Sequence, residues 1–189
     1  EDIKGVVNVP IIEDKLGVKL FGAQVKSDGF VYNTTLNEDV GGDDVQNFGF
    51  AAKLQATDQF DIKLHYEKTK DESDQGAYVN QNVGTDNTCV FFNSCVTNTT
   101  DNENQNSSNT RNFSDNEYDT TILTANYDFG DMVLTYIGAQ RDMDEQNMQS
   151  FDASPADFLD MNYFNEWDQE SHELRLTTNF DGPLNFVAG

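Results

Sequence analysis

The sequence alternates apolar and polar side chains over several short segments. The clearest is segment 60–67. Its apolar side chains are Phe60, Ile62, Leu64 and Tyr66, and its polar ones are Asp61, Lys63, His65 and Glu67. A period of two is that of a β-strand, whose successive side chains point to opposite faces. No helical pattern of useful length accompanies it, so the predicted fold class is all-β.

Eight strands are expected, arranged as four antiparallel hairpins, with the last strand incomplete. The expected strands are 6–12, 16–25, 48–55, 60–67, 118–127, 132–141, 171–179 and 184–189. Within each hairpin a tight turn joins the two strands. These turns are Glu13-Asp14-Lys15, Thr57-Asp58-Gln59, Phe129-Gly130-Asp131 and Asp181-Gly182-Pro183.

Short and long connections alternate strictly along the chain. The long, polar connections lie at about 27–46, 71–116 and 142–168. A compact soluble domain rarely contains loops of such length. Outer-membrane barrels combine short periplasmic turns with longer extracellular loops. The pattern therefore favours part of an up-and-down transmembrane β-barrel, with one face toward lipid and the other toward a wet lumen.

The polar faces of the expected strands carry charged side chains at mid-strand. The residues expected to face the lumen are Lys19, Lys53, Asp61, Lys63, His65, Glu67, Glu173 and Arg175. Aromatic residues beside the short turns are expected to form an interfacial girdle, and these are Phe60, Tyr127, Phe129, Phe180 and Phe186. A soluble β-sandwich also buries one face of each strand, so alternation alone leaves that alternative open.

Composition excludes several classes of protein. The net charge of −23 argues against nucleic acid as a partner, because phosphate binding needs a basic surface. An aromatic content of 12% argues against a disordered acidic tail. No apolar run reaches the roughly 18 residues of a membrane-spanning helix. Cys89 and Cys95 are expected to form a small loop disulfide if the protein is exported, with free thiols as the alternative.

Both ends of the chain look internal to a longer protein. The chain opens at Glu1 without a signal peptide and stops at Phe186-Val187-Ala188-Gly189 inside an expected strand. Both termini are therefore interpreted as cuts.

The C-terminal hairpin also carries a recognisable motif. Segment 170–177 contains Glu173-Leu174-Arg175-Leu176-Thr177, and segment 179–189 contains an Asp181-Gly182 turn followed by Leu184-Asn185-Phe186-Val187-Ala188-Gly189. The motif resembles the barrel domain of TonB-dependent receptors, and segments 8–16 and 127–135 are similar to other hairpins of that family.

The resemblance implies that residues 1–189 are a partial barrel domain, about eight strands of a plugged barrel of roughly 22. It also implies a location in the bacterial outer membrane, in contact with its lipid. Coupling to the TonB–ExbB–ExbD system would occur through a region before Glu1. The ligand would be a scarce small molecule, namely a siderophore, haem, cobalamin or an oligosaccharide. No cofactor is implied.

Five aromatic residues in the expected long loops are candidates for ligand binding, and these are Phe91, Phe92, Tyr163, Phe164 and Trp167. Packing of loops against one another is the alternative role for them. The acidic segments 43–44, 71–72 and 101–103 lack a calcium-loop spacing and are interpreted as solvated, with no metal site assigned. No nucleophile or pocket signature accompanies Asp61, His65 and Glu67, so no catalytic residue is assigned and an enzyme is not expected.

Two rival functions remain open from the sequence. One is a small non-energised outer-membrane barrel or porin, which requires eight strands that close on themselves. The other is a soluble acidic β-sandwich that acts as a binding module.

Overall fold

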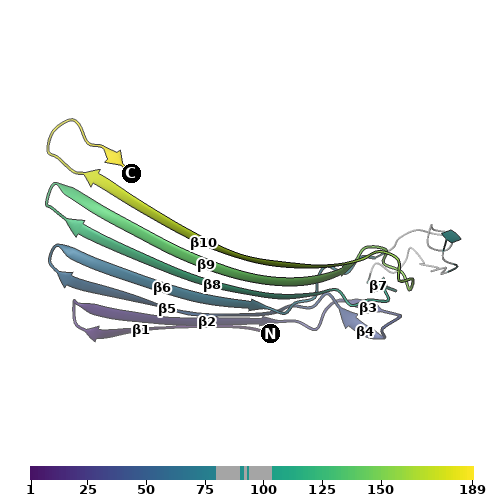
Figure 1. Ribbon diagram of the computed structural model, residues 1–189. Coiled ribbons are helices and arrows are strands. Elements are labelled where there is room, and N and C mark those ends of the chain that lie inside the picture. Colours follow the sequence, from purple (N-terminus) through teal and green to yellow (C-terminus); the bar gives the residue numbers. More distant parts are fainter. Residues whose placement is uncertain (80–89, 92, 94–103) are drawn as a thin grey trace.

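The structure is a computed structural model that describes residues 1–79, 90, 91, 93 and 104–189 (Figure 1). Its strands are β1 (Asp2–Ile12), β2 (Leu16–Lys26), β3 (Val31–Asn33), β4 (Glu38–Val40), β5 (Asp44–Thr57), β6 (Phe60–Asp71), β7 (Gln105–Asn106), β8 (Phe113–Asp128), β9 (Met132–Ser150), β10 (Asp160–Thr178) and β11 (Val187–Ala188). No helix among the described residues is long and apolar enough to cross a membrane.

Eight of these strands form one large sheet in the order β1-β2-β5-β6-β8-β9-β10-β11. Each pairs antiparallel with its neighbour, so the sheet is an up-and-down meander. The hairpin turns gather at one end of this sheet, and β3, β4 and β7 lie at the opposite end (Figure 1). The predicted eight antiparallel strands are confirmed.

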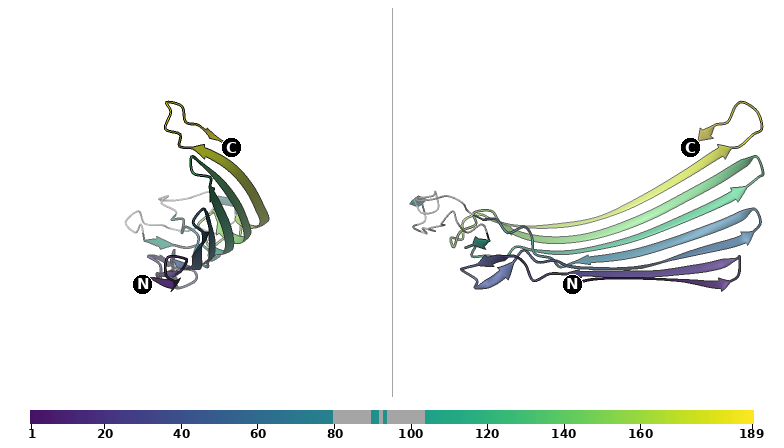
Figure 2. Two further views of the ribbon diagram at one scale, coloured as in Figure 1. Left: turned by 90° about the vertical axis from the view of Figure 1, so that its left-hand side faces the viewer. Right: turned by 180° about the vertical axis from the view of Figure 1, so that it is seen from behind.

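The large sheet is a single layer that curves into an arc (Figure 2). In the part of the chain that the structure describes, its strands contact only their hydrogen-bonded neighbours, and no second sheet packs on either face. The described strands therefore do not form a β-sandwich with one another. Strands β1 and β11 are the two edges of the sheet and do not pair with each other, so these eight strands do not close into a small barrel.

The strand register assigns side chains to the two faces of the arc. Cross-strand partners share a face, and one face carries Ser114 and Asn147, to which Gln75 of a long connection donates hydrogen bonds of 2.7 and 2.8 Å. The end-on view in Figure 2 places the loop-end segments on the concave side of the arc. We call the face with Ser114 the concave face and the opposite one the convex face.

The convex face carries an apolar band next to the short turns. One row of register partners across it is Leu54, Ile62, Ala125, Tyr136 and Leu174. Many apolar side chains of this face are exposed because no described residue covers them, among them Val7, Leu20, Phe48, Leu123 and Leu174. Phe60, Ile62 and Leu64 belong to this band and are not sealed beneath another layer.

The apolar band has a limit on the side of the loops, and this limit runs obliquely across the strands. On β5 the last apolar side chain before the polar region is Phe48, whereas on β10 it is Leu174, which lies in the row of Leu54. Phe48 and Leu54 are six residues apart, which is about 20 Å along a strand, and four strand spacings separate β5 from β10, which is about 19 Å. The limit is thus inclined by about 45°, close to the strand tilt of membrane barrels.

One predicted loop is wrong. Residues 142–168 were expected to form a long connection, but β9 continues to Ser150, β10 begins at Asp160, and only residues 151–159 connect them. In this region the convex face of the sheet is polar. Asp142, Asp144 and Gln146 lie on the convex face, so the apolar alternation that predicts strands disappears. Residues 27–43 and 72–112 connect the strands of the large sheet where long connections at about 27–46 and 71–116 were expected.

The last hairpin also differs from its prediction. A tight turn at 181–183 and a strand over 184–189 were expected, but residues 179–186 form the connection and β11 covers only Val187–Ala188. The Asn185 side chain holds this connection in a loop. Its Oδ1 accepts a hydrogen bond from the Phe180 backbone nitrogen at 2.6 Å, and its Nδ2 donates to the Phe180 carbonyl at 3.2 Å.

Candidate ligand-binding surface

The loop end of the molecule is held together by buried polar side chains rather than by an apolar core. The fully buried ones among the described residues are Asn33, Asn147, Ser150 and Ser154, whereas the buried apolar ones are only Val31, Val40 and Ala153. Asn33 joins two connections, because its Nδ2 donates to the Ser108 carbonyl at 3.0 Å while its Oδ1 accepts from the Thr35 nitrogen at 2.9 Å. The network fixes the long connections to one another.

Arg111 is the main ionic contact of this network. Its guanidinium donates two hydrogen bonds to Asp74, at 2.8 and 3.2 Å, and lies 3.3 Å from Glu38. The Asp74 side chain is only 6% exposed and also accepts hydrogen bonds from the Gly41 and Gly42 nitrogens. The hydrogen bond to Asp74 raises the pKa of Arg111 above its already high ordinary value. Arg111 therefore stays charged and ties the 27–43 connection to the 72–112 connection.

A second group of side chains lies on the concave face below the loops. The guanidinium of Arg141 on β9 is 5.5 Å from the ring centre of Tyr118 on β8 and 6.0 Å from that of Trp167 on β10. Arg141 forms no ion pair with any residue that the structure describes. The Tyr118 hydroxyl donates to Glu145 at 3.1 Å, and Asn165 donates to the other oxygen of that carboxylate at 3.1 Å. An exposed cation between two aromatic rings suits an anionic or aromatic ligand.

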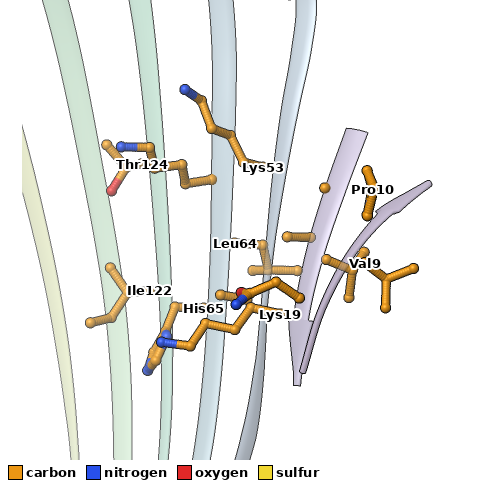
Figure 3. Close-up of a pocket in the computed structure, with 14 residues that line it drawn as sticks. Val9, Pro10, Lys19, Lys53, Leu64, His65, Ile122 and Thr124 are labelled. Carbon is orange, nitrogen blue, oxygen red and sulfur yellow. The ribbon is translucent and has the colours of Figure 1, made fainter. Parts of the chain in front are cut away.

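The third group surrounds a hollow in the concave face near the short turns, with a volume of about 580 Å³. Lys19, Lys53, Lys63 and His65 line it, together with small or apolar residues such as Ala51 and Ile122. Figure 3 shows the ends of the Lys19 and His65 side chains close together, whereas the Lys53 side chain extends away from them. The Phe21 ring stacks on His65 with centroids 5.6 Å apart. It lies so close over Gly49 that a Cβ there would come within 2.5 Å of the ring.

All eight residues expected to face a lumen lie on the concave face. They are Lys19, Lys53, Asp61, Lys63, His65, Glu67, Glu173 and Arg175. Three of those on β6, Asp61, His65 and Glu67, have partners along or across the strands. Glu67 lies 3.2 Å from His65 and accepts from Asn47 at 2.8 Å, while Asp61 accepts from Asn126 at 3.1 Å.

The five aromatic ligand-binding candidates do not form one site. Tyr163 and Trp167 are on the concave face of β10, not in a loop, whereas Phe164 of the same strand is on the convex face and 67% exposed. Phe91 is 74% exposed. Phe92 lies outside the described residues, and so do Cys89, Cys95 and the acidic segment 101–103.

The acidic pairs at 43–44 and 71–72 serve in contacts within the fold. Asp44 pairs with Lys26 at 2.6 Å, and Glu72 pairs with Lys70 at 2.7 Å. Among the residues that the structure describes, no group of three metal-ligating side chains is close enough to hold an ion.

Sequence reasoning missed Arg111, Tyr118 and Arg141. Tyr118 and Arg141 lie on β8 and β9, in the part of these strands between the apolar band and the loops. Hydropathy does not alternate regularly there, so it did not show that the two side chains share a face. Arg141 gave no local signal, because its two aromatic neighbours, Tyr118 and Trp167, lie on the adjacent strands and not beside it in the sequence. Arg111 gave no signal, since its partners Glu38 and Asp74 are far away in sequence.

The aromatic side chains expected at the girdle lie together at the short turns. Phe60 and Tyr127 have ring centres 6.2 Å apart, and Tyr127 and Phe129 are 4.5 Å apart. Tyr127, Phe129, Phe180 and Phe186 are all exposed. Exposed aromatic rings at the edge of an apolar band are typical of a membrane interface.

No protein-family model and no curated protein sequence matches this chain. The chain is similar to the crystal structure of the ferric yersiniabactin uptake receptor FyuA from Yersinia pestis, with a TM-score of 0.76 and 19% sequence identity, over 98% of this chain and 27% of the receptor. It is also similar to the siderophore receptor PirA from Acinetobacter baumannii, with a TM-score of 0.65 and 15% identity, over 98% of this chain and 26% of that receptor.

The chain thus spans about a quarter of the length of either receptor. At these identities the likeness establishes the fold. The fold is that of a partial, antiparallel up-and-down barrel wall of the kind these receptors contain, as the resemblance to TonB-dependent receptors implied.

Proposed function

We propose that these residues form part of the wall of an outer-membrane receptor that actively takes up a scarce small ligand, such as a ferric siderophore. The observation that carries the proposal is the division of one curved sheet into an exposed apolar convex band and a charged concave face. In hydrocarbon every backbone group needs an internal partner, which a closed barrel supplies. The unpaired edges at β1 and β11 therefore require further strands in the membrane.

The side chains of the concave face favour a ligand that carries negative charge and planar groups. Arg141 between Tyr118 and Trp167 offers a cation and two aromatic faces to the same ligand. It lies between the loop network and the hollow near the turns, which is where a ligand captured outside would enter a lumen. Transport itself requires no chemical step from these side chains. Energy would come from the TonB–ExbB–ExbD system through another region of the protein.

The test is uptake of radiolabelled iron by a strain that carries the full-length protein as its only receptor, with candidate siderophores supplied singly. The Trp167→Ala, Arg141→Ala double variant removes the cation and one ring. We expect the half-saturating concentration to rise about tenfold, since such contacts contribute roughly 1–2 kcal/mol. Phe164→Ala is the matched control, because Phe164 lies on the same strand but on the convex face.

Two outcomes would contradict the proposal. Recovery of the full-length protein in the soluble fraction would exclude a membrane barrel. Uptake that persists in a strain without TonB would indicate a non-energised channel.

A further inference from the structure

The hollow near the short turns has an unusual charge for this protein. The chain has a net charge of −23, yet no aspartate or glutamate lines the hollow. Three lysines and a histidine line it instead, namely Lys19, Lys53, Lys63 and His65. The side chains come from β2, β5 and β6, whose register holds them on one face (Figure 3).

The register brings two of these lysines directly opposite each other. Lys53 on β5 and Lys63 on β6 are cross-strand partners, and Lys19 pairs with Ala51, two residues before Lys53. Like charges that face each other across two strands destabilise a sheet. The arrangement therefore costs free energy unless an anion lies between the amino groups.

No carboxylate of the described residues supplies that anion. Lys19, Lys53 and Lys63 form no ion pair with any residue that the structure describes. Most of the other cations do form one, and these are Lys4, Lys26, Lys68, Lys70, Arg111 and Arg175. The nearest acids on the same face of β6, Asp61 and Glu67, are hydrogen-bonded to Asn126 and His65.

We propose that this hollow binds carboxylate groups, held between Lys53 and Lys63, while Lys19 and His65 line another part of the same hollow. Its volume of about 580 Å³ is in the range of small-molecule sites. Pro10, Ala51 and Ile122 add apolar surface, which suits a carboxylate carried on a hydrocarbon frame. The carboxylates belong either to a free polycarboxylate or to another segment of the same polypeptide. This inference depends on the proposed function in one respect, namely that water reaches the concave face.

The test is calorimetric titration of the purified full-length protein in detergent with citrate as the probe. Lys53→Met with Lys63→Met removes both charges with little change in length. Lys53→Arg with Lys63→Arg keeps the charges and is the conservative control. Lys15→Met, in a tight turn outside this hollow, controls for the loss of a lysine elsewhere.

If the carboxylates come from a free ligand, the wild type and the arginine variant bind citrate, and the methionine variant binds at least tenfold more weakly. If they come from the polypeptide, citrate does not bind to the wild type. In that case the methionine variant melts at a lower temperature than the Lys15→Met control, and the difference shrinks in 1 M salt, where charges are screened within about 3 Å.

The proposal is overturned if citrate binds equally to the wild type and the methionine variant, or if citrate does not bind and the methionine variant melts at or above the temperature of the Lys15→Met control, because the lysines then gain nothing from a carboxylate. These readouts do not involve uptake, so they remain interpretable if the transport proposal fails.

Discussion

The two ends of the long strands belong to different environments although they are continuous. Near the short turns the convex face is apolar, with Leu64, Leu123 and Tyr136 in it. Near the loops the same face carries Asp119, Asp142 and Asp168 side by side in one row. The strands therefore extend well beyond the apolar band. Hydrogen-bonded pairing thus continues along the whole length of the strands. The side chains of the convex face change, however, from apolar near the turns to acidic near the loops.

The largest expected effect comes from a charge in the apolar band. Leu123→Arg should destabilise the full-length protein in lipid vesicles by about 2–4 kcal/mol, measured by urea unfolding, because the guanidinium would enter hydrocarbon. Asp168→Arg, on the same face but above the band, is the control and should change stability little. Equal effects of the two substitutions would show that the two ends share one environment.

A smaller effect is expected in the loop network. Arg111→Ala should weaken the attachment of the 27–43 connection by about 1–2 kcal/mol, because it leaves the buried Asp74 carboxylate without its charged donor. Hydrogen exchange at the Gly41 and Gly42 amides, which donate to Asp74, measures it. Arg175→Ala, which breaks an exposed pair at 3.7 Å, should leave these amides unchanged. Unchanged exchange in the Arg111 variant would mean that backbone contacts alone hold the connection.

The pair of Lys26 and Asp44 should make the loop end sensitive to acid. The hydrogen bond from Lys26 lowers the pKa of Asp44 below its ordinary value of 3.8. A lowered pKa in the folded state contributes stability at neutral pH, and this contribution is lost as the pH falls through the lowered value. Exchange at the Ser27 and Asp44 amides should therefore accelerate in strong acid relative to its intrinsic rate, and Asp44→Asn should abolish this dependence. An identical acid response in that variant would assign the effect to another group.

The smallest effect is expected from the acidic row. Asp142 lies between Asp119 and Asp168 on neighbouring strands, and like charges in this position repel. Asp142→Asn should raise stability by about 0.2–1 kcal/mol at low salt, and the gain should vanish at high salt. Loss of stability would instead show that a cation bridges the row.

The same contrast explains which parts of the fold were predictable. Strands such as 60–67 were found because an apolar convex face and a polar concave face produce a period of two. The loop ends of β9 and β10 were missed because polar side chains on the convex face interrupt that period. As a result Tyr163 and Trp167 were placed in a loop. The concave position of Lys53 and Lys63 followed from alternation, but their direct pairing depends on register, which an irregularity between Gln55 and Thr57 shifts beside the turn.

The central claim is that lipid covers the convex face of the sheet while water covers the concave face. Cysteine substitutions at Lys63 and Leu64, adjacent on β6 and on opposite faces, test it most directly in the full-length protein in vesicles. We predict that a water-soluble maleimide labels Lys63→Cys, and that a lipid-attached quencher acts only on a fluorophore coupled at Leu64→Cys before reconstitution. Labelling of both positions from water, or quenching at position 63 and not at 64, would contradict the account.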